Sequence, residues 1–476
     1  MPSAKRSRSG KLNLNLLDGR ARRALLYSIL NFAREATVSA TKVAIVGLGT
    51  VGSGLAKILL SHADRVARNA GGPIELSRVV VRDLKKPRQV ELPAAVVSDD
   101  IESVLKDPEI KIVAQLIGGL EPARSIMLQL LDSGKDVVTA NKALIAAHGE
   151  ELFTRARELG RSIAFEASVA GGIPIIANIS QCLSGNQITS LRGILNGTSN
   201  FIVSQMEECD RDYAAALKEA QDLGYAEADP AMDVDGSDAA QKLAILSHLA
   251  FGAQPDWKEI PREGIDTLQT IDIRCASDLG YRIKLLAVAK LHENNELELH
   301  VSPTFVRHGI PLAEVRGAFN AVSVVGDAVG PVFYHGQGAG QMPTASAVAA
   351  DLIDLAVGRA KITFNAANLW GGQKPLVGLN DPDSATSRYY LRVIVKDQPR
   401  VLAEIASALG EHDVSIASMI QRESQNSTDP KDGSTPVVSL VIMTHSASAG
   451  AMSKAVAKID KLDVVQEKSV RMRVLD

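Results

Sequence analysis

An aspartate and a lysine four residues apart, Asp238 and Lys242, stand at the start of an apolar run that predicts a helix beginning near Ser237. Side chains at positions i and i+4 share one helix face, so we expect the carboxylate and the ammonium to lie side by side. A partly buried lysine beside carboxylates has a tunable pKa and can act as a general acid. Nearby carboxylates can also bind a substrate ammonium group, and four more acids crowd this segment: Glu227, Asp229, Asp233 and Asp235.

Two simpler interpretations of these acids stay open on residue types alone. The first is an exposed Asp–Lys pair, which would stabilise the helix by only a few tenths of a kcal/mol. The second is a calcium loop, although the regular acidic spacing and the closing glutamate of such a loop are absent. The cluster by itself does not decide between them.

A glycine-rich turn between a predicted strand and a predicted helix indicates the binding of a dinucleotide. Residues 42–46, KVAIV, form a short, mainly apolar run rich in β-branched residues, and the sequence GLGTVG follows at 47–52. In this pattern the glycines permit the turn, let the backbone approach a pyrophosphate and let the helix pack on the strand. The helix N-terminus adds free N–H groups for the anion. We assign cofactor contacts to Gly47, Gly49, Thr50, Val51 and Gly52.

The end of the next predicted strand bears on the choice between NAD and NADP. Residues 76–81 predict a strand that ends at Arg82 and Asp83. An acid at this place holds the ribose hydroxyls, whereas an arginine can hold a 2′-phosphate. Arg82, with Lys85 and Lys86 close by, favours NADP, and Asp83 keeps NAD open.

Strands and helices alternate after this turn, which predicts a parallel, doubly wound sheet whose ligands lie beyond the carboxyl ends of its strands. Lys142 follows such a strand, and we expect it to face the cofactor. Glu166 lies in an uncharged stretch, where the residue types favour a salt bridge or a helix cap over a bound cation. Residues 193–201, GILNGTSNF, are interpreted as a loop or a bend in a sheet. Gly340 precedes a later helix, whose N-terminus is a second anion-friendly site.

The composition of the 476 residues excludes several classes of protein. The chain is 46% hydrophobic and 22% charged, as in ordinary globular proteins, and its net charge of −3 gives no electrostatic case for nucleic acid or a membrane surface. Three cysteines without a CxxC motif argue against a disulfide scaffold or a zinc ribbon, and we expect a cytoplasmic protein. Residues 1–40 are basic and predict an extension with an amphipathic helix. We interpret it as a solvated arm, with a transit peptide as the alternative.

Six segments together resemble homoserine dehydrogenase. They are GLGTVGSG (47–54), TANKALIA (139–146), EASVAGGIPII (166–176), GILNGTSNF (193–201), GYAEADPAMDVDGSDAAQKLAIL (224–246) and GQGAGQMPTASAV (336–348). The resemblance implies a Rossmann-type NAD(P)-binding domain at 41–165, onto which helix 340–360 packs back. An α+β catalytic and dimerisation domain at 166–339 would follow.

The resemblance also implies the activity and the roles of individual residues. The reaction would be the reversible, NAD(P)-dependent interconversion of L-homoserine and L-aspartate 4-semialdehyde in threonine, methionine and isoleucine biosynthesis. Lys242 matches the family's general acid–base, Asp238 the acid that positions it, and Lys142 a contact of both cofactor and substrate. Glu227 and Asp233 match substrate-binding carboxylates, and Gly340 belongs to the cofactor site. Glu166, with the carbonyls of Val169, Gly171 and Ile173, matches a structural sodium (Na+) site.

Residues 387–476, after a linker at 376–386, predict the order βαββαβ of a ferredoxin-like unit. The unit resembles an ACT domain, whose turn before the first helix is matched by Asp397 and Pro399. Such domains pair and bind amino acids, so we expect threonine as a feedback inhibitor and a homodimer or homotetramer. The alternative is a dimerisation module that has lost its ligand. For the whole chain, the competing hypotheses are another NAD(P)-dependent amino-acid or semialdehyde dehydrogenase, and a sensor without turnover.

Overall fold

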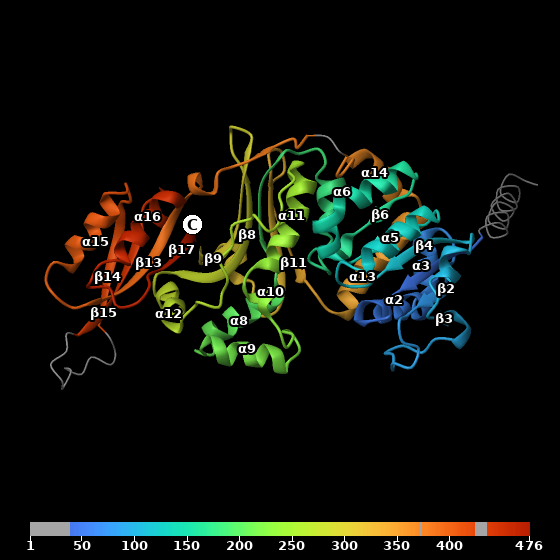
Figure 1. The fold of residues 1–476 in the computed structure, drawn as a ribbon, viewed down its shortest axis with the longest axis horizontal. Coiled ribbons are helices and arrows are strands. Elements are labelled where there is room, and N and C mark those ends of the chain that lie inside the picture. The colour runs from blue at the N-terminus through green and yellow to red at the C-terminus, as the bar shows by residue number, and fades with distance from the viewer. Residues whose placement is uncertain (1–38, 372–373, 424–435) are drawn as a thin grey trace, which may run out of the picture.

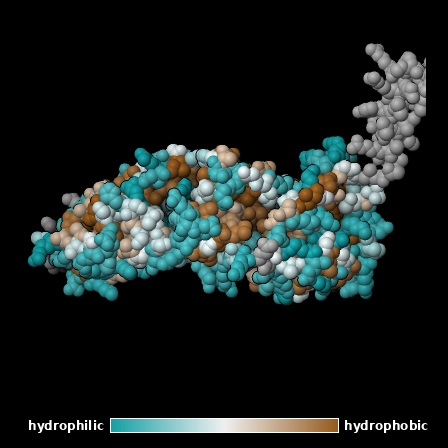
Figure 2. Space-filling model, turned by 90° about the horizontal axis from the view of Figure 1, so that it is seen from above, coloured by the Kyte–Doolittle hydropathy of each residue, from teal (hydrophilic) through white to brown (hydrophobic). Residues whose placement is uncertain are grey.

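The computed structural model describes residues 39–371, 374–423 and 436–476. Three units follow one another along the long axis of the molecule, an N-terminal, a central and a C-terminal unit (Figure 1). Seen from above, apolar residues gather over the middle of the molecule (Figure 2). The arm and the amphipathic helix predicted within residues 1–38 lie outside the described residues. No helix in the described ranges is both long and apolar enough to cross a membrane.

The N-terminal unit is built on a parallel sheet with the strand order β3-β2-β1-β4-β5-β6, which confirms the predicted doubly wound fold. Its strands are β1 (Thr41–Val46), β2 (Ile74–Val80), β3 (Val97–Ser98), β4 (Ile110–Gln115), β5 (Asp136–Thr139) and β6 (Ile163–Ala164). Its helices are α2 (Thr50–Ser61), α3 (Ala63–Ala70), α4 (Glu102–Leu105), α5 (Ala123–Asp132) and α6 (Lys142–Glu158).

Two helices from much later in the sequence also belong beside this sheet, α13 (Gln341–Ala356) and α14 (Arg359–Ala367). One apolar face of α13, with Ala345, Val348 and Leu352, is buried in the same core as Leu55 of α2. The chain therefore returns to the N-terminal unit after it has formed the central unit.

The central and C-terminal units share one continuous sheet, with the order β11-β10-β7-β8-β9-β17-β13-β15-β14. The central strands are β7 (Ile188–Ile194), β8 (Tyr281–Leu291), β9 (Glu296–Arg307), β10 (Phe319–Gly326) and β11 (Gly330–Gln337). Neighbouring strands along this path are antiparallel except at one seam, where β17 (Val470–Leu475) runs parallel to β9. The central helices are α7 (Ile175–Ala177), α8 (Gly197–Glu208), α9 (Tyr213–Asp222), α10 (Ala231–Val234), α11 (Ser237–Phe251) and α12 (Thr270–Asp278).

The segment GILNGTSNF corrects one prediction, because it is the end of β7 and the first turn of α8. Glycine, threonine, serine and asparagine are all weak helix formers, so their run favoured a loop. The helix begins here because the side chain of Asn196 accepts a hydrogen bond from the Ser199 N–H at 2.7 Å. A side-chain acceptor at this position satisfies one of the free N–H groups of the first turn.

The C-terminal unit has the predicted order βαββαβ. It comprises β13 (Thr386–Lys396), α15 (Val401–Gly410), β14 (Ile416–Glu423), β15 (Val437–Thr444), a short β16 (Ala447–Ser448), α16 (Ala449–Ile459) and β17. The predicted linker is partly structured, since β12 (Gly378–Leu379) pairs with β9. A buried ion pair also joins this unit to α12, with Arg392 Nε 2.7 Å from Asp272 Oδ1. Two contacts therefore fix these units to each other: the parallel pairing of β9 with β17, called the seam, and the buried ion pair between Arg392 and Asp272, called the clamp.

Candidate active site

Helices α6 and α11 bring Lys142, Asp238 and Lys242 together between the N-terminal and central units. Lys142 is the first residue of α6, and Asp238 lies in the first turn of α11. The Asp238 carboxylate lies between both lysines, with Oδ2 2.7 Å from Lys242 Nζ and Oδ1 3.0 Å from Lys142 Nζ. The predicted i,i+4 pair is therefore present, and one carboxylate links it to the lysine of the other unit.

Burial and charge give the three groups different proton affinities. Burial alone would raise the pKa of Asp238, but Lys242 and Lys142 together hold it well below its usual range. The pKa of Lys142 is raised, mainly by Asp238. Burial lowers the pKa of Lys242, and the positive charge of Lys142 lowers it further against the opposing effect of Asp238. Lys242 is therefore the ammonium of this pair that releases its proton more readily.

The other acids of the segment divide into two groups. Asp233 on α10 is half-buried, with a pKa raised by burial, and the exposed Glu227 is close enough to raise the pKa of Lys142. Asp229 and Asp235 instead accept hydrogen bonds from the N–H groups of Ala231 and Ser237. Asp233 and Glu227 are thus available to a ligand, whereas the other two hold local turns.

Sequence reasoning missed the residue that connects these carboxylates. The side-chain Nδ2 of Asn196 is 2.8 Å from Asp233 Oδ1 and 2.8 Å from Asp238 Oδ2. The available signal was an asparagine directly after a strand, inside a segment of small polar residues. Because that segment gave no helix periodicity, its role as a cap was not visible.

The glycine turn has the geometry that a dinucleotide needs. Gly47 has a φ of +100°, and a Cβ on Gly52 would lie 2.1 Å from the Gly47 carbonyl oxygen. Both positions therefore require glycine. A Cβ on Gly49 would meet no atom within 4 Å, which leaves open space at the start of α2. Thr50 and Val51 are the first residues of that helix and present its N-terminus to this space.

Of the other predicted cofactor residues, Gly340 lies next to this turn, whereas no hydrogen bond within the described ranges holds Arg82 there. Gly340 is the N-cap of α13, and a Cβ on Gly54 of α2 would lie 2.8 Å from the carbonyl oxygen of the next residue, Gln341. The two helix N-termini are therefore neighbours. Arg82 is exposed and has no hydrogen-bond partner among the described residues. Arg88, which the sequence reasoning did not select, donates from Nη1 to the Leu48 carbonyl at 3.4 Å.

The Glu166 carboxylate is buried and binds the N-terminus of α7. Its two oxygens accept the N–H groups of Ile176 at 2.9 Å and Ala177 at 2.7 Å. Burial raises the pKa of Glu166 to about 7, and Asp351 lies close by with a raised pKa of its own. The contact is the helix-cap type that the residue types favoured over a bound cation.

The carbonyl oxygens that the resemblance assigns to a sodium site lie in the turn that follows Glu166. Val169 and Gly171 are buried, and their carbonyl oxygens accept no hydrogen bond from the described residues. The Ile173 carbonyl accepts the Ile175 N–H at 2.7 Å. Oxygen atoms without partners in a buried turn suit a hard cation, so the residues fit the ion.

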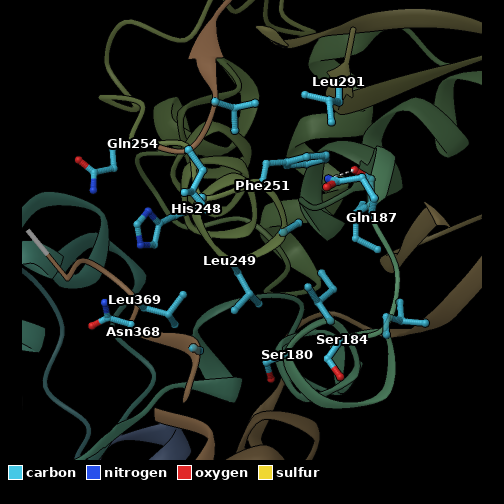
Figure 3. Close-up of a pocket in the computed structure, with 18 of the residues that line it drawn as sticks. Ser180, Ser184, Gln187, His248, Leu249, Phe251, Gln254, Leu291, Asn368 and Leu369 are labelled. Carbon is cyan, nitrogen blue, oxygen red and sulfur yellow. Dashed lines mark hydrogen bonds between the residues drawn. The ribbon is translucent and has the colours of Figure 1, made fainter. Parts of the chain in front are cut away.

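A large cavity, of about 630 Å³, lies at the opposite end of α11 from Asp238 and Lys242. Figure 3 shows His248, Leu249 and Phe251 of this helix on one side and Ser180 and Ser184 on another. No carboxylate is found among its described lining residues. Since neither the lysines nor the glycine turn faces this cavity, we place the candidate site at the acid–lysine cluster instead.

The wall of this cavity includes a close contact between the units. The indole of Trp370 stacks on the His248 ring at 4.2 Å, and its backbone N–H donates to His248 Nε2 at 2.7 Å. The carbonyl of Trp370 accepts from Arg157 of α6 at 2.6 Å. Trp370 therefore joins α6 and α11 at the ends away from their reactive residues.

Comparison with known proteins assigns families to all three units. Residues 47–166 match a family model described as homoserine dehydrogenase, NAD binding domain, and residues 174–353 match the one described as homoserine dehydrogenase. Residues 389–464 match the ACT domain model.

Named relatives and solved structures carry the same description. The homoserine dehydrogenase of Pseudomonas aeruginosa is 43% identical over 91% of this chain and 98% of its own, and that of Bacillus subtilis is 39% identical over 92% and 99%. The crystal structure of the Thiobacillus denitrificans homoserine dehydrogenase superposes with a TM-score of 0.83, at 42% identity, over 92% of this chain and 99% of that one. A mutant of a hyperthermophilic archaeal homoserine dehydrogenase in complex with NADPH matches at 27% identity, over 66% of this chain and 97% of that one, with a TM-score of 0.56.

Proposed function

Because this chain belongs to the homoserine dehydrogenase family, and is an NAD(P)-dependent oxidoreductase, we propose that Lys242 is its general acid–base. A bound nicotinamide supplies or accepts the hydride at the substrate carbon. When the aldehyde is reduced, negative charge develops on its oxygen, and the Lys242 ammonium donates a proton there. In the oxidation of homoserine, the neutral amine takes the hydroxyl proton. The observation that carries this proposal is the buried Lys242–Asp238 pair.

We propose that Asp238 positions both lysines and that Lys142 contacts substrate and cofactor. Lys142 stays charged because its pKa is raised, so it suits the binding of a developing oxyanion or of the substrate carboxylate. Glu227 and Asp233 would hold the substrate ammonium, since both lie around Lys142 without an ion-pair partner of their own among the described residues. The substrate pair that this set serves is L-homoserine and L-aspartate 4-semialdehyde.

The proposed cofactor is NADP in preference to NAD. Gly47, Gly49, Thr50, Val51 and Gly52 would hold the pyrophosphate, and Gly340 would close the site from α13. Arg82 and Arg88 would supply positive charge for a 2′-phosphate. The archaeal mutant in complex with NADPH supports a nicotinamide cofactor of this type. Comparing KM for NADP+ and NAD+ in the wild type and in Arg82→Ala and Arg88→Ala variants tests the preference.

A sodium ion at Glu166, Val169, Gly171 and Ile173 is proposed as a structural element. Its test is the melting temperature in Na+ against choline at equal ionic strength, above pH 7, where Glu166 is ionised. We expect a higher melting temperature in Na+ for the wild type and none of this gain for Glu166→Gln. Equal melting temperatures in both salts would contradict the site.

The ACT domain is proposed to bind threonine and to mediate feedback inhibition, as part of threonine, methionine and isoleucine biosynthesis in the cytoplasm. A homodimer or homotetramer is proposed with it. The edge strand β11 supports association, because Phe333 is exposed there beside Phe319 and His335. An active enzyme without residues 387–476 that threonine still inhibits would refute the assignment of the effector to this domain.

The experiment that tests the main proposal is homoserine-dependent reduction of NADP+ and NAD+ by the purified chain. We expect turnover in the wild type and its loss in Lys242→Ala, with NADPH binding retained. The matched control is Lys218→Ala, because Lys218 forms an i,i+4 ion pair with Asp222 that is exposed. An active Lys242→Ala enzyme would contradict the role of Lys242.

A further inference from the structure

Asn196 occupies the turn between β7 and α8 and is 5% exposed. Its Oδ1 accepts the Ser199 N–H at 2.7 Å, and its Nδ2 donates to Asp233 and Asp238, each at 2.8 Å. A carboxamide has two N–H hydrogens. Each hydrogen of Nδ2 is therefore donated to a different carboxylate, while Oδ1 caps the N-terminus of α8.

The orientation of this carboxamide follows from its partners. If the oxygen and nitrogen exchanged places, the NH₂ group would face the N–H of Ser199, and the oxygen would face two carboxylates. All three contacts would then be repulsive. The cap on α8 thus fixes the direction in which the two N–H groups of Asn196 point.

The residue type is as specific as the orientation. Serine, threonine, aspartate and asparagine can all accept a hydrogen bond at a helix N-cap. Of these side chains, the carboxamide alone also carries two N–H donors. Asn196 therefore combines a cap with a bridge between two acids, which the other cap residues cannot do.

The two acids need such a bridge because they share one buried site. Asp238 faces Lys242 from α11 and Lys142 from α6, and Asp233 faces the same two lysines and Asp238 itself. Glu227 adds a further negative charge near Lys142. Two carboxylates that lie close together cannot both ionise easily, so one tends to take up a proton.

We propose that Asn196 is a positioning residue, which holds Asp233 and Asp238 side by side in the charged form. Asp238 can then orient the lysines while Asp233 stays open to the substrate ammonium. The same turn also places Lys242, whose Nζ donates to the Leu195 carbonyl at 2.7 Å. This inference rests on the proposed roles of Asp238 and Lys242 and extends them to a residue that acts through the two acids it contacts.

The test is the pH profile of kcat/KM for aspartate 4-semialdehyde reduction in Asn196→Asp, because Lys242 acts there as the ammonium and the acid limb reports the carboxylates. This variant keeps an acceptor for the Ser199 N–H and nearly the same size, but it places a third carboxylate against the other two. We expect the acid limb of the profile to move up by about one pH unit, because the cluster will hold a proton to higher pH. On the acid limb itself we expect kcat/KM at a given pH to fall about tenfold, the change that one pKa unit represents, with NADPH affinity unchanged.

A second variant separates charge from shape. Asn196→Asp combined with Asp233→Asn restores the original number of carboxylates, so the acid limb should return at least halfway, while KM for homoserine stays high. Asn196→Ser keeps the cap but loses the double donor, and its acid limb should also rise. The matched control is Asp212→Asn, which makes the reverse exchange at the exposed N-cap of α9 and should leave the profile unchanged.

The outcomes distinguish this inference from the proposed function. If Lys242→Ala retains activity, the role of Lys242 is wrong and the inference falls with it. If Lys242→Ala is inactive but folded Asn196→Asp and Asn196→Ser keep the wild-type acid limb and kcat/KM, Asn196 only caps the helix and the inference alone is overturned. Should Asn196→Asp fail to fold, the serine variant decides.

Discussion

At the scale of single residues, the chemistry depends on how a few charges share one small volume. Lys142 and Lys242 both contact Asp238, so each lysine affects the proton affinity of the other. Lys142 lowers the pKa of Lys242, since two positive charges repel. The charged partner from the N-terminal unit therefore helps to make Lys242 a better proton donor.

Replacing Lys142 should consequently change the pH dependence of catalysis as well as substrate binding. In Lys142→Gln we expect the pKa of Lys242 to rise, so the acid limb of the kcat/KM profile for homoserine oxidation, in which Lys242 must be neutral, should move to higher pH. KM for homoserine should increase. The measurement is the rate of NADP+ reduction from pH 6 to pH 11, and an acid limb that stays in place would show that the lysines do not interact.

The buried Glu166 leads to a prediction about stability. Its pKa is about 7 in the folded protein against 4.5 in the unfolded chain, so the fold prefers the protonated form. Its contribution is complete below about pH 4.5 and is lost as the pH rises through 7. Relative to Glu166→Gln, the wild type should lose about 3 kcal/mol of unfolding free energy between pH 4.5 and pH 8. Urea denaturation in sodium-free buffer measures this difference, and parallel pH dependences would contradict it.

At the scale of elements, the turn between β1 and α2 contains glycines required for two different reasons, close packing of the backbone and space for a ligand. A Cβ on Gly52 would collide with the Gly47 carbonyl, whereas a Cβ on Gly49 would enter open space. We expect Gly52→Ala to lower both the melting temperature and the affinity for NADPH. Gly49→Ala should keep the melting temperature and weaken NADPH binding alone. Fluorescence titration with NADPH and thermal denaturation test these two variants. If Gly49→Ala binds NADPH as tightly as the wild type, the pyrophosphate does not lie at Gly49.

The same scale shows what could be predicted from the sequence. The strand–glycine turn–helix at 41–61 and the start of α11 at Ser237 are confirmed, because local periodicity and turn residues specify them. Helix α8 was missed, since its start depends on a side-chain cap within weak helix formers. The Lys142–Asp238 contact joins residues far apart in the sequence, and no local pattern predicts that partner.

At the scale of the whole molecule, the clamp between Arg392 and Asp272 holds the C-terminal unit on the central one. Both side chains are almost fully buried, and Tyr390 donates to the same carboxylate at 2.9 Å. Nothing in the sequence indicated this pair. Removing one partner of a buried ion pair leaves an uncompensated charge and costs about 3–5 kcal/mol.

We therefore expect Arg392→Met to destabilise the chain by about that amount. The double variant Arg392→Met with Asp272→Leu should regain part of the loss, because no buried charge remains. Urea denaturation measures both, and the exposed Arg155→Met, whose pair with Asp132 lies at the surface, is the control. Equal stability of Arg392→Met and the control would show that the clamp is not needed.

The seam between β9 and β17 also has a consequence for the order in which the protein is made. β9 is complete at Arg307, but its partner β17 begins only at Val470. During synthesis the edge of β9 that pairs with β17 therefore keeps its backbone N–H and C=O groups unpaired while residues 308–469 are added. Unpaired edges of this kind are sites where nascent chains associate wrongly. Slow translation or early chain termination within residues 308–469 should therefore favour aggregation. Molecular chaperones that bind nascent chains would act mainly during this interval.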